Sequence, residues 1–209
     1  RRAAAAALTS RAPHGPMATV LATPPALAPL ARAPLTGRDG ATTTGSALWA
    51  TRPSVIYVLR RPGCVLCRAT AARIAALAPQ LESMGVGLVC VANAWLPAEV
   101  EAFVDGYWPL PVYLDSEQAF FAAVGGGTVR RGSLTSFLNP FSRSWKNAKA
   151  AKAAGAAGNM TGDGLTMGGL LAVKKGDGGV VFAAQETDFG DAPTDDQVLA
   201  AARAAAGKQ

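Results

Sequence analysis

Cys64 and Cys67, separated by two residues, constrain the fold more than any other feature of this chain. An apolar, β-branched run at residues 55–59 precedes them and predicts a buried strand. After them, apolar residues recur at three- and four-residue steps up to Gly85 and predict a helix; they are Ile74, Leu77, Leu81 and Met84. We therefore expect both cysteines where a strand turns into a helix, on one side of its first turn.

The residues around the pair favour an ionised thiol. Pro62 and Gly63 predict a sharp turn before the helix. At the start of a helix, free backbone N–H groups and the helix dipole attract negative charge, so a thiolate forms more easily there. Arg60, Arg61 and Arg68 add positive charge. Two cysteines in this spacing beside a βαβ pattern predict a redox-active dithiol.

The composition narrows the chemistry further. The 209 residues suffice for one domain and an appendage, and the odd number of cysteines, three, argues against a secreted disulfide scaffold. The third, Cys90, lies in an apolar run and is expected to be a small buried hydrophobe. The single histidine, His14, lies in the N-terminal stretch, which disfavours Cys–His and Ser–His dyads and most zinc sites. No apolar run approaches the ~20 residues of a membrane span.

Residues 1–48 differ from the rest in composition. They are rich in Ala, Pro, Thr and Arg, and the first acidic residue is Asp39. We expect this low-complexity leader to form no helix or packed core, with the folded domain at residues 49–209. Its composition resembles an organelle transit peptide, chloroplast more than mitochondrial. The alternatives are a disordered linker, or an extended arm attached to a larger cytoplasmic or cytoskeletal assembly.

The remaining segments alternate between strand and helix. The pattern predicts strands at residues 86–92 and 109–115, helices at 97–104 and 118–124, an antiparallel hairpin of 168–173 with 180–184, and a capped helix from 194. This order predicts an α/β sandwich with a mixed sheet and the hairpin at one edge.

A basic helical insertion is expected at residues 128–157, where no acidic residue occurs. Its cations include Arg130, Arg131, Lys146, Lys149 and Lys152. They predict a docking face for an acidic protein, an anionic lipid surface or RNA, and the ordinary alternative is a solvated helical face. No aromatic interleaving or glycine-rich signature accompanies them, which disfavours nucleic acid.

Several motifs together resemble a known family. The stretch RPGCVLCR at residues 61–68 is similar to the signature of the AhpC/TSA-like, peroxiredoxin-like proteins that include prostamide/prostaglandin F synthase. The further matches are at residues 113–115, 158–163, 168–171 and 189–191. The resemblance covers about residues 52–205 and excludes the leader.

The resemblance implies a thioredoxin-like, peroxiredoxin-like three-layer sandwich, here preceded by an extended N-terminal arm. It implies that Cys64 and Cys67 form the redox pair, and the supporting residues carried over with it are Arg61, Pro62, Gly63, Arg68, Gly168 and Gly169. The family's prostaglandin F synthase branch reduces an endoperoxide with NADPH as the eventual electron source, and the basic insertion resembles that branch. We therefore expect no bound cofactor, with electrons from a thioredoxin-like or NADPH-linked reductant.

The roles within the pair stay open at this point. Exposure at the helix start would make Cys64 the attacking thiolate and Cys67 the resolving thiol. The peroxiredoxin comparison instead gives Cys67 the peroxidatic position and puts Cys64 in place of a Thr or Ser. Arg60 stands where peroxiredoxins have a proline, which disfavours efficient hydroperoxide reduction.

Two further departures bear on substrate choice. Residues 167–169, Met-Gly-Gly, occupy the position where thioredoxins have a cis-proline. Two glycines there predict a roomier rim and disfavour a general protein-disulfide reductase. The chain has no Gly-x-Gly-x-x-Gly sequence, so no nicotinamide site is predicted.

The leading hypothesis is a thiol-dependent oxidoreductase that reduces a peroxide, endoperoxide or disulfide through Cys64 and Cys67. The second is a non-catalytic or redox-sensing accessory subunit of a large assembly, attached through residues 1–48 and the basic insertion. A third, metal binding by the two cysteines, would need ligands from another chain.

Overall fold

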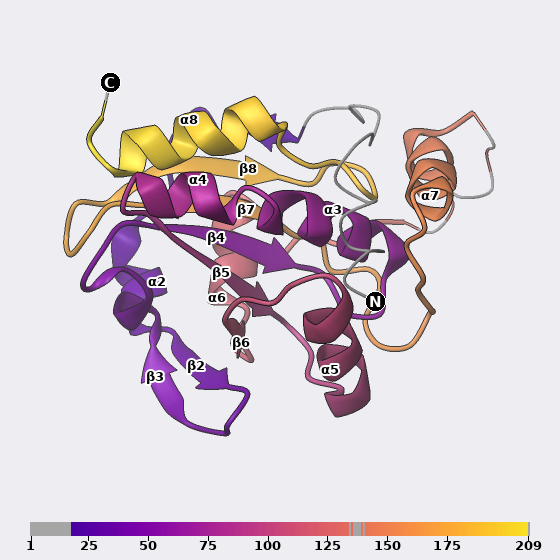
Figure 1. Ribbon diagram of the computed structural model, residues 1–209, viewed down its shortest axis with the longest axis horizontal. Coiled ribbons are helices and arrows are strands. Elements are labelled where there is room, and N and C mark those ends of the chain that lie inside the picture. Colours follow the sequence, from indigo (N-terminus) through magenta and orange to yellow (C-terminus); the bar gives the residue numbers. More distant parts are fainter. Residues whose placement is uncertain (1–17, 134, 136–138, 140, 209) are drawn as a thin grey trace.

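A single eight-stranded mixed sheet, with helices on both faces, forms the frame of the molecule (Figure 1). The computed structural model describes residues 18–133, 135, 139 and 141–208. The strands are β1 (Thr19–Val20), β2 (Pro34–Gly37), β3 (Thr42–Thr44), β4 (Ser54–Leu59), β5 (Gly87–Ala92), β6 (Val112–Leu114), β7 (Gly169–Val173) and β8 (Val180–Gln185). The helices are α2 (Leu27–Arg32), the 3-10 helix η1 (Gly45–Trp49), α3 (Val65–Ala75), α4 (Ala78–Ser83), α5 (Pro97–Gly106), α6 (Ala119–Val124), α7 (Arg143–Ala153) and α8 (Asp195–Ala205).

The strand order in the sheet is β1-β8-β7-β4-β5-β6-β2-β3. The central strands β4, β5 and β6 are parallel, and β7 runs antiparallel to β4. Every residue of β4 is buried, as expected for a parallel strand covered on both faces. Its side chains alternate: Val55 and Tyr57 enter the core on one face, and Ile56 and Val58 enter the core on the other.

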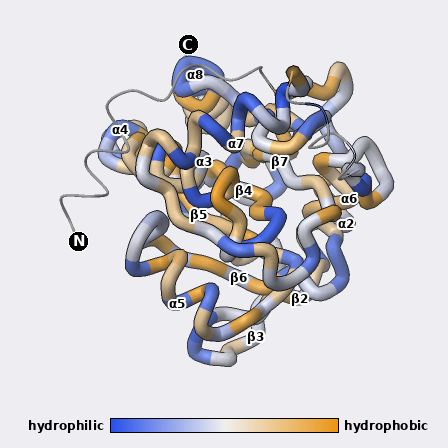
Figure 2. Tube along the Cα trace, turned by 90° about the vertical axis from the view of Figure 1, so that its right-hand side faces the viewer, coloured by the Kyte–Doolittle hydropathy of each residue, from blue (hydrophilic) through white to orange (hydrophobic). Residues whose placement is uncertain are grey.

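The two cores give the sandwich its three layers. Side chains of α3, α4, α5 and α8 pack on the face that also carries both cysteines of the pair. The opposite face is covered by α2, η1 and α6, which contribute Leu30, Trp49, Phe120 and Phe121. Figure 2 shows β4, near the centre of the molecule, largely in the hydrophobic colour. The α/β fold class predicted from the sequence is confirmed, as are the strand 86–92 and the capping box at Thr194.

The predicted N-terminal boundary at residue 49 is wrong. Residues 18–48 supply α2 and three strands, of which β2 pairs with β6 and β1 pairs with β8. Leu30 and Leu35 are fully buried in the second core. The sequence did not predict these elements because the segment has no regular hydrophobic period. Its few apolar side chains nevertheless complete the sheet and the layer that covers it. The expected leader at residues 1–17 lies outside the described residues.

The helix expected from the cysteines to Gly85 is divided into two. α3 ends at Ala75 and α4 begins at Ala78, with Pro79 in its first turn. Proline lacks the N–H that a continuous helix needs and therefore starts a new one. Gly85 ends α4 as predicted, with a φ of 75° that favours glycine.

Two other expectations need adjustment. The hairpin of β7 and β8 is antiparallel as predicted, but it is not the edge of the sheet, because β1 pairs with β8 on its outer side. Within the basic insertion, the helix described is α7, which carries Lys146, Lys149 and Lys152. None of the helices described is both long and apolar enough to cross a bilayer.

Candidate active site

The two cysteines lie at the carboxyl end of β4, where the chain turns into α3. Cys64 is the N-cap residue of α3 and Cys67 belongs to its first turn, so the predicted strand-to-helix position is confirmed. Both are free thiols. The expected exposure is wrong, since Cys64 is 6% exposed and Cys67 only 2%. The pair lies under a cover of protein, and Cys64 is the more accessible of the two sulfurs.

Arg60 binds both sulfurs. Its Nη2 lies 3.1 Å from Cys64 Sγ and 3.3 Å from Cys67 Sγ. The side chain is buried, and its guanidinium carbon lies 4.7 Å from the centre of the Phe189 ring. A buried, permanently charged donor between two thiols stabilises a negative charge on either of them. The sequence placed Arg60 near the pair but did not single it out among the supporting residues.

The surroundings separate the acidities of the two thiols. The hydrogen bond from the Cys67 thiol lowers the pKa of Cys64 well below its ordinary value, and the charge of Arg60 acts in the same direction against burial. Burial raises the pKa of Cys67 well above its ordinary value, and the interaction with Cys64 adds to this. The arrangement therefore favours Cys64 as the thiolate and Cys67 as the thiol that donates a hydrogen bond to it.

Glu186, just beyond β8, completes the charged cluster. Its Oε2 accepts a hydrogen bond from Gly168 N at 2.9 Å and lies 4.0 Å from Arg60 Nε. Burial raises the pKa of this carboxyl group. The sequence analysis missed Glu186 because no local pattern connects it to Arg60, which is far away in the chain.

Arg61 and Arg68 mainly organise the cover of the site. Arg61 donates to the Thr161 carbonyl at 2.6 Å and also lowers the pKa of Cys64 through its charge. Arg68 donates to the carbonyl groups of Pro62 and Ala157, and it forms an ion pair of 2.9 Å with Glu99. The prediction that Arg68 acts on the thiols is not supported by a contact, since these bonds direct its guanidinium group to the covering segment.

The covering segment consists of residues 157–161, which form neither helix nor strand. Asn159 N donates to the Gly63 carbonyl at 2.8 Å, and Asn159 Nδ2 donates to Glu99 at 2.7 Å. A Cβ atom on Gly63 would lie 2.6 Å from Asn159 Oδ1, and one on Gly158 would lie 2.5 Å from Val65 N, so the backbones of the two segments approach closely. The buried turn of Pro62 and Gly63 is thus held under this loop.

Gly168 and Gly169 do not form an open rim, and that prediction is wrong. Gly169 begins β7, between β4 and β8. A Cβ atom on Gly168 would collide with the Val58 carbonyl group, and one on Gly169 with the Ala184 carbonyl group. These glycines allow close strand packing and the hydrogen bond to Glu186.

The other sequence-derived candidates lie elsewhere. Cys90 is fully buried in β5, and burial raises its pKa, in agreement with the expected structural role.

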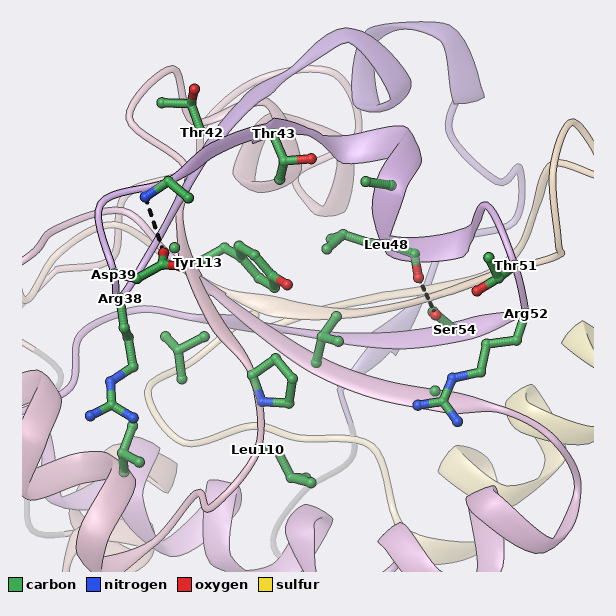
Figure 3. A pocket seen from close by; sticks show the side chains of 18 of the residues that line it. Arg38, Asp39, Thr42, Thr43, Leu48, Thr51, Arg52, Ser54, Leu110 and Tyr113 are labelled. Carbon is green, nitrogen blue, oxygen red and sulfur yellow. Dashed lines mark hydrogen bonds between the residues drawn. The ribbon is translucent and has the colours of Figure 1, made fainter.

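A cavity of about 920 Å³ lies at the amino ends of β4 and β5 beside the β2–β3 hairpin (Figure 3). Arg38 and Arg52 border it, but each is paired with a glutamate, and none of the residues predicted for the redox site lines it. Over the described part of the chain, no three His, Cys, Asp or Glu side chains gather to hold a metal ion.

Comparisons with known proteins identify the family of the chain. The family model of the AhpC/TSA antioxidant enzymes matches residues 73–188, a region that begins after the cysteine pair. A peroxiredoxin-like 2A protein of Gallus gallus is 34% identical over 171 residues, covering 79% of this chain and 71% of the relative. A peroxiredoxin-like 2A protein of Danio rerio is 35% identical over 162 residues, covering 75% and 71%.

Solved structures support the fold. The bacterioferritin comigratory protein of Xanthomonas campestris superposes with a TM-score of 0.58 at 17% identity, covering 90% of this chain and 99% of that one. Peroxiredoxin Q of Xanthomonas campestris gives a TM-score of 0.54 at 18% identity, covering 83% of this chain and 90% of that one. With the relatives and the family match, these findings show that the chain belongs to the peroxiredoxin-like AhpC/TSA family and has its thioredoxin-like fold.

Proposed function

We propose that this protein is a thiol-dependent oxidoreductase that reduces a peroxide through Cys64 and Cys67. The observation that carries the proposal is the buried guanidinium group of Arg60, 3.1 Å and 3.3 Å from the two sulfurs. A permanent charge at this position both activates the attacking sulfur and stabilises its thiolate between turnovers. A buried pair with only a packing role would have no need of an arginine.

The directions of the two pKa shifts support a division of roles between the cysteines. Cys64, with the lowered pKa and the greater exposure, attacks the peroxide. The sulfur takes up one oxygen as a sulfenic acid, the O–O bond breaks, and the other oxygen leaves as an alcohol after taking up a proton. Cys67 then attacks the sulfenic acid, forms the Cys64–Cys67 disulfide and releases water. An external dithiol restores both thiols and becomes a disulfide itself.

The proposal also names a class of substrate and a class of reductant. The Xanthomonas bacterioferritin comigratory protein has been analysed for alkyl peroxide reduction, so alkyl hydroperoxides are the first substrates to try. An endoperoxide would react by the same attack on an O–O bond. We propose a thioredoxin-like or NADPH-linked reductant as the electron source.

The test follows the disulfide and the turnover separately. The reduced full chain is mixed with an alkyl hydroperoxide, and the Cys64–Cys67 disulfide is measured by thiol trapping and peptide mass spectrometry. We expect stoichiometric disulfide, turnover with thioredoxin, thioredoxin reductase and NADPH, and a reduction potential of roughly −300 to −180 mV.

Cysteine variants distinguish the roles. Cys64→Ser should abolish reaction, whereas Cys67→Ser should consume one equivalent of peroxide and leave a sulfenic acid on Cys64. Cys90→Ser is the matched control and should keep activity, because Cys90 lies in β5 and the only hydrogen bond of its thiol among the described residues is to the Val91 carbonyl. If the wild-type chain forms no disulfide with any peroxide, the catalytic proposal fails and the accessory-subunit hypothesis takes its place.

A further inference from the structure

The orientation of α7 is fixed by directed contacts on its inner side. Arg143 forms ion pairs with Asp188 and Asp191, and Asn147 donates to the Phe189 carbonyl at 3.0 Å. Ala151 is buried against the core on the same side of the helix. Because these contacts lie on one side, they determine which side chains of α7 face outward.

The outer side of α7 combines aromatic and basic side chains. Trp145, Lys149 and Lys152 stand at positions i, i+4 and i+7, so they form one stripe on the helix. Trp145 is 47% exposed, and Phe141, just before the N-cap Ser142, is 81% exposed. The sequence analysis found no aromatic residues among these cations, and that conclusion is wrong. We refer to Phe141, Trp145, Lys146, Lys149 and Lys152 as the outer face of α7.

The exposure of this face is unusual for the molecule. The described residues include four exposed large apolar side chains, and three of them lie between residues 141 and 160: Phe141, Trp145 and Met160. An exposed phenylalanine and an exposed tryptophan in the same stretch as several lysines are typical of a surface that meets a partner. In Figure 1, α7 lies at the right-hand side of the molecule, outside the layers that cover the sheet.

Among the described residues, no ion pair neutralises the lysines of the outer face. α7 contains no acidic residue, and none of the ion pairs found in the described part of the chain involves Lys146, Lys149 or Lys152. Arginine, which binds carboxylates in fixed geometry, is used only on the inner side. The outward cations are all lysines, which bind anions as flexible point charges.

We propose that the outer face of α7 binds the surface of an anionic lipid bilayer. Regularly spaced lysines suit a laterally uniform negative surface, whereas a folded acidic protein presents carboxylates at fixed points, which arginine matches better. Phe141 supplies an apolar ring and Trp145 an amphipathic one, and both rings enter the headgroup region. The association is peripheral, salt-sensitive and independent of the dithiol chemistry.

The position of this face has a consequence for the proposed enzyme. A Cβ atom on Gly190 would lie 3.0 Å from Asn147 Cβ in α7 and 3.1 Å from Leu66 Cδ2 between the two cysteines. Gly190 thus lies between the inner side of α7 and the turn that carries the two cysteines. If the proposed function holds, a bilayer bound to the outer face lies one helix diameter, roughly 10 Å, from this side of that turn.

Vesicle sedimentation tests the binding directly. The reduced full chain is incubated with vesicles of phosphatidylcholine alone, or of phosphatidylcholine with phosphatidylserine, at low and high salt. We expect binding to the anionic vesicles only, lost at high salt. Cys64→Ser should bind equally well, so that failure of the redox chemistry and failure of lipid binding are distinguished.

Matched variants locate the surface. The triple variant K146E/K149E/K152E should lose at least about tenfold in partition to anionic vesicles. The control K174E/K175E/K208E changes the net charge equally but lies elsewhere in the chain, and it should bind like the wild type. F141S/W145S keeps all charges and should bind several-fold more weakly. Circular dichroism checks that each variant is folded.

Three results would overturn the proposal. Equal binding to neutral and anionic vesicles, or equal losses in the two triple variants, would show that the outer face is not the determinant. Absence of vesicle binding together with binding to a poly-glutamate peptide or to RNA through the same lysines would assign the face to an acidic protein or a nucleic acid instead.

Discussion

Arg60 is the buried cation that contacts both thiols of the pair. Its guanidinium group contacts both sulfurs, while Glu186 lies on its other side at 4.0 Å. Its charge is therefore shared between two possible thiolates and one buried carboxyl group. The directions of the pKa shifts favour Cys64 as the sulfur that holds the negative charge, because the Cys67 thiol stabilises it and burial disfavours charge on Cys67.

Arg60→Met should raise the pKa of Cys64, because the variant keeps the length of the side chain but removes its charge. We expect the rate of iodoacetamide modification of Cys64 at neutral pH to fall by about tenfold or more, since the thiolate fraction falls tenfold for every unit that the pKa rises. Arg60→Lys restores the charge and should recover part of the rate. An unchanged rate in Arg60→Met would exclude Arg60 as the activating group.

Glu186→Gln should act in the opposite direction. Burial is the main cause of the raised pKa of Glu186, and repulsion between its carboxylate and the Cys64 thiolate adds to it. The amide oxygen can still accept the hydrogen bond from Gly168, so the fold is preserved. We expect the pKa of Cys64 to fall further and its modification below neutral pH to become a few-fold faster. A slower modification would contradict this.

The places of individual residues could be predicted from the sequence where a short local stretch determines them. Cys64, Cys67, Pro62 and Gly63 follow from the strand-to-helix turn, which is a property of a short stretch. Glu186 and Glu99 could not be predicted, because their partners are brought near only by the tertiary fold. Their burial, unlike that of apolar residues, follows no periodic pattern.

At the scale of elements, the close packing of β7 against its neighbours explains Gly168 and Gly169, two glycines in one of the stretches that match the family. Gly168 and Gly169 lie where backbone atoms of β4 and β8 leave no room for a side chain. They were interpreted from the sequence as a substrate rim. Sequence can show that a glycine is present, but whether its missing side chain leaves space or is required by a neighbour depends on the packed structure.

Gly168→Ala should therefore destabilise the fold, by about 1–3 kcal/mol, because the added methyl group forces β7 away from β4. Urea unfolding followed by circular dichroism measures this. Gly106→Ala is the control: it lies at the end of α5 with no atom within 4 Å of the added methyl group, and should be neutral or slightly stabilising. Equal effects of the two substitutions would refute the packing argument.

For the whole molecule, the alternation of strands and helices was sufficient to predict the order of the central elements from β4 to α8. Hydrophobic periodicity and turn residues are strong there. It did not reveal that the N-terminal segment completes the sheet at both edges. Two- to four-residue strands such as β1, β2 and β3 are too short to produce a period, and their pairing is a long-range property.

A chain that begins at residue 49 should consequently fail to fold like the full chain. It loses the buried side chains of Leu30 and Leu35 and leaves Trp49 and Phe120 without part of their cover. We expect a lower unfolding temperature and a loss of cooperativity, measured by calorimetry. A chain that begins at residue 18 is the control and should keep a cooperative transition. Identical transitions for the two shortened chains would show that residues 18–48 are dispensable.

The most direct test of the account is the pH dependence of alkylation at each cysteine of the reduced full chain, resolved by peptide mass spectrometry. We predict that Cys64 reacts with a midpoint well below the value of about 8.5 for free cysteine, while Cys67 and Cys90 stay unreactive until higher pH. Such a result would confirm Cys64 as the thiolate stabilised by Cys67 and Arg60. If Cys67 reacts first, or if neither thiol of the pair reacts near neutral pH, the assignment of Cys64 as the attacking residue is wrong.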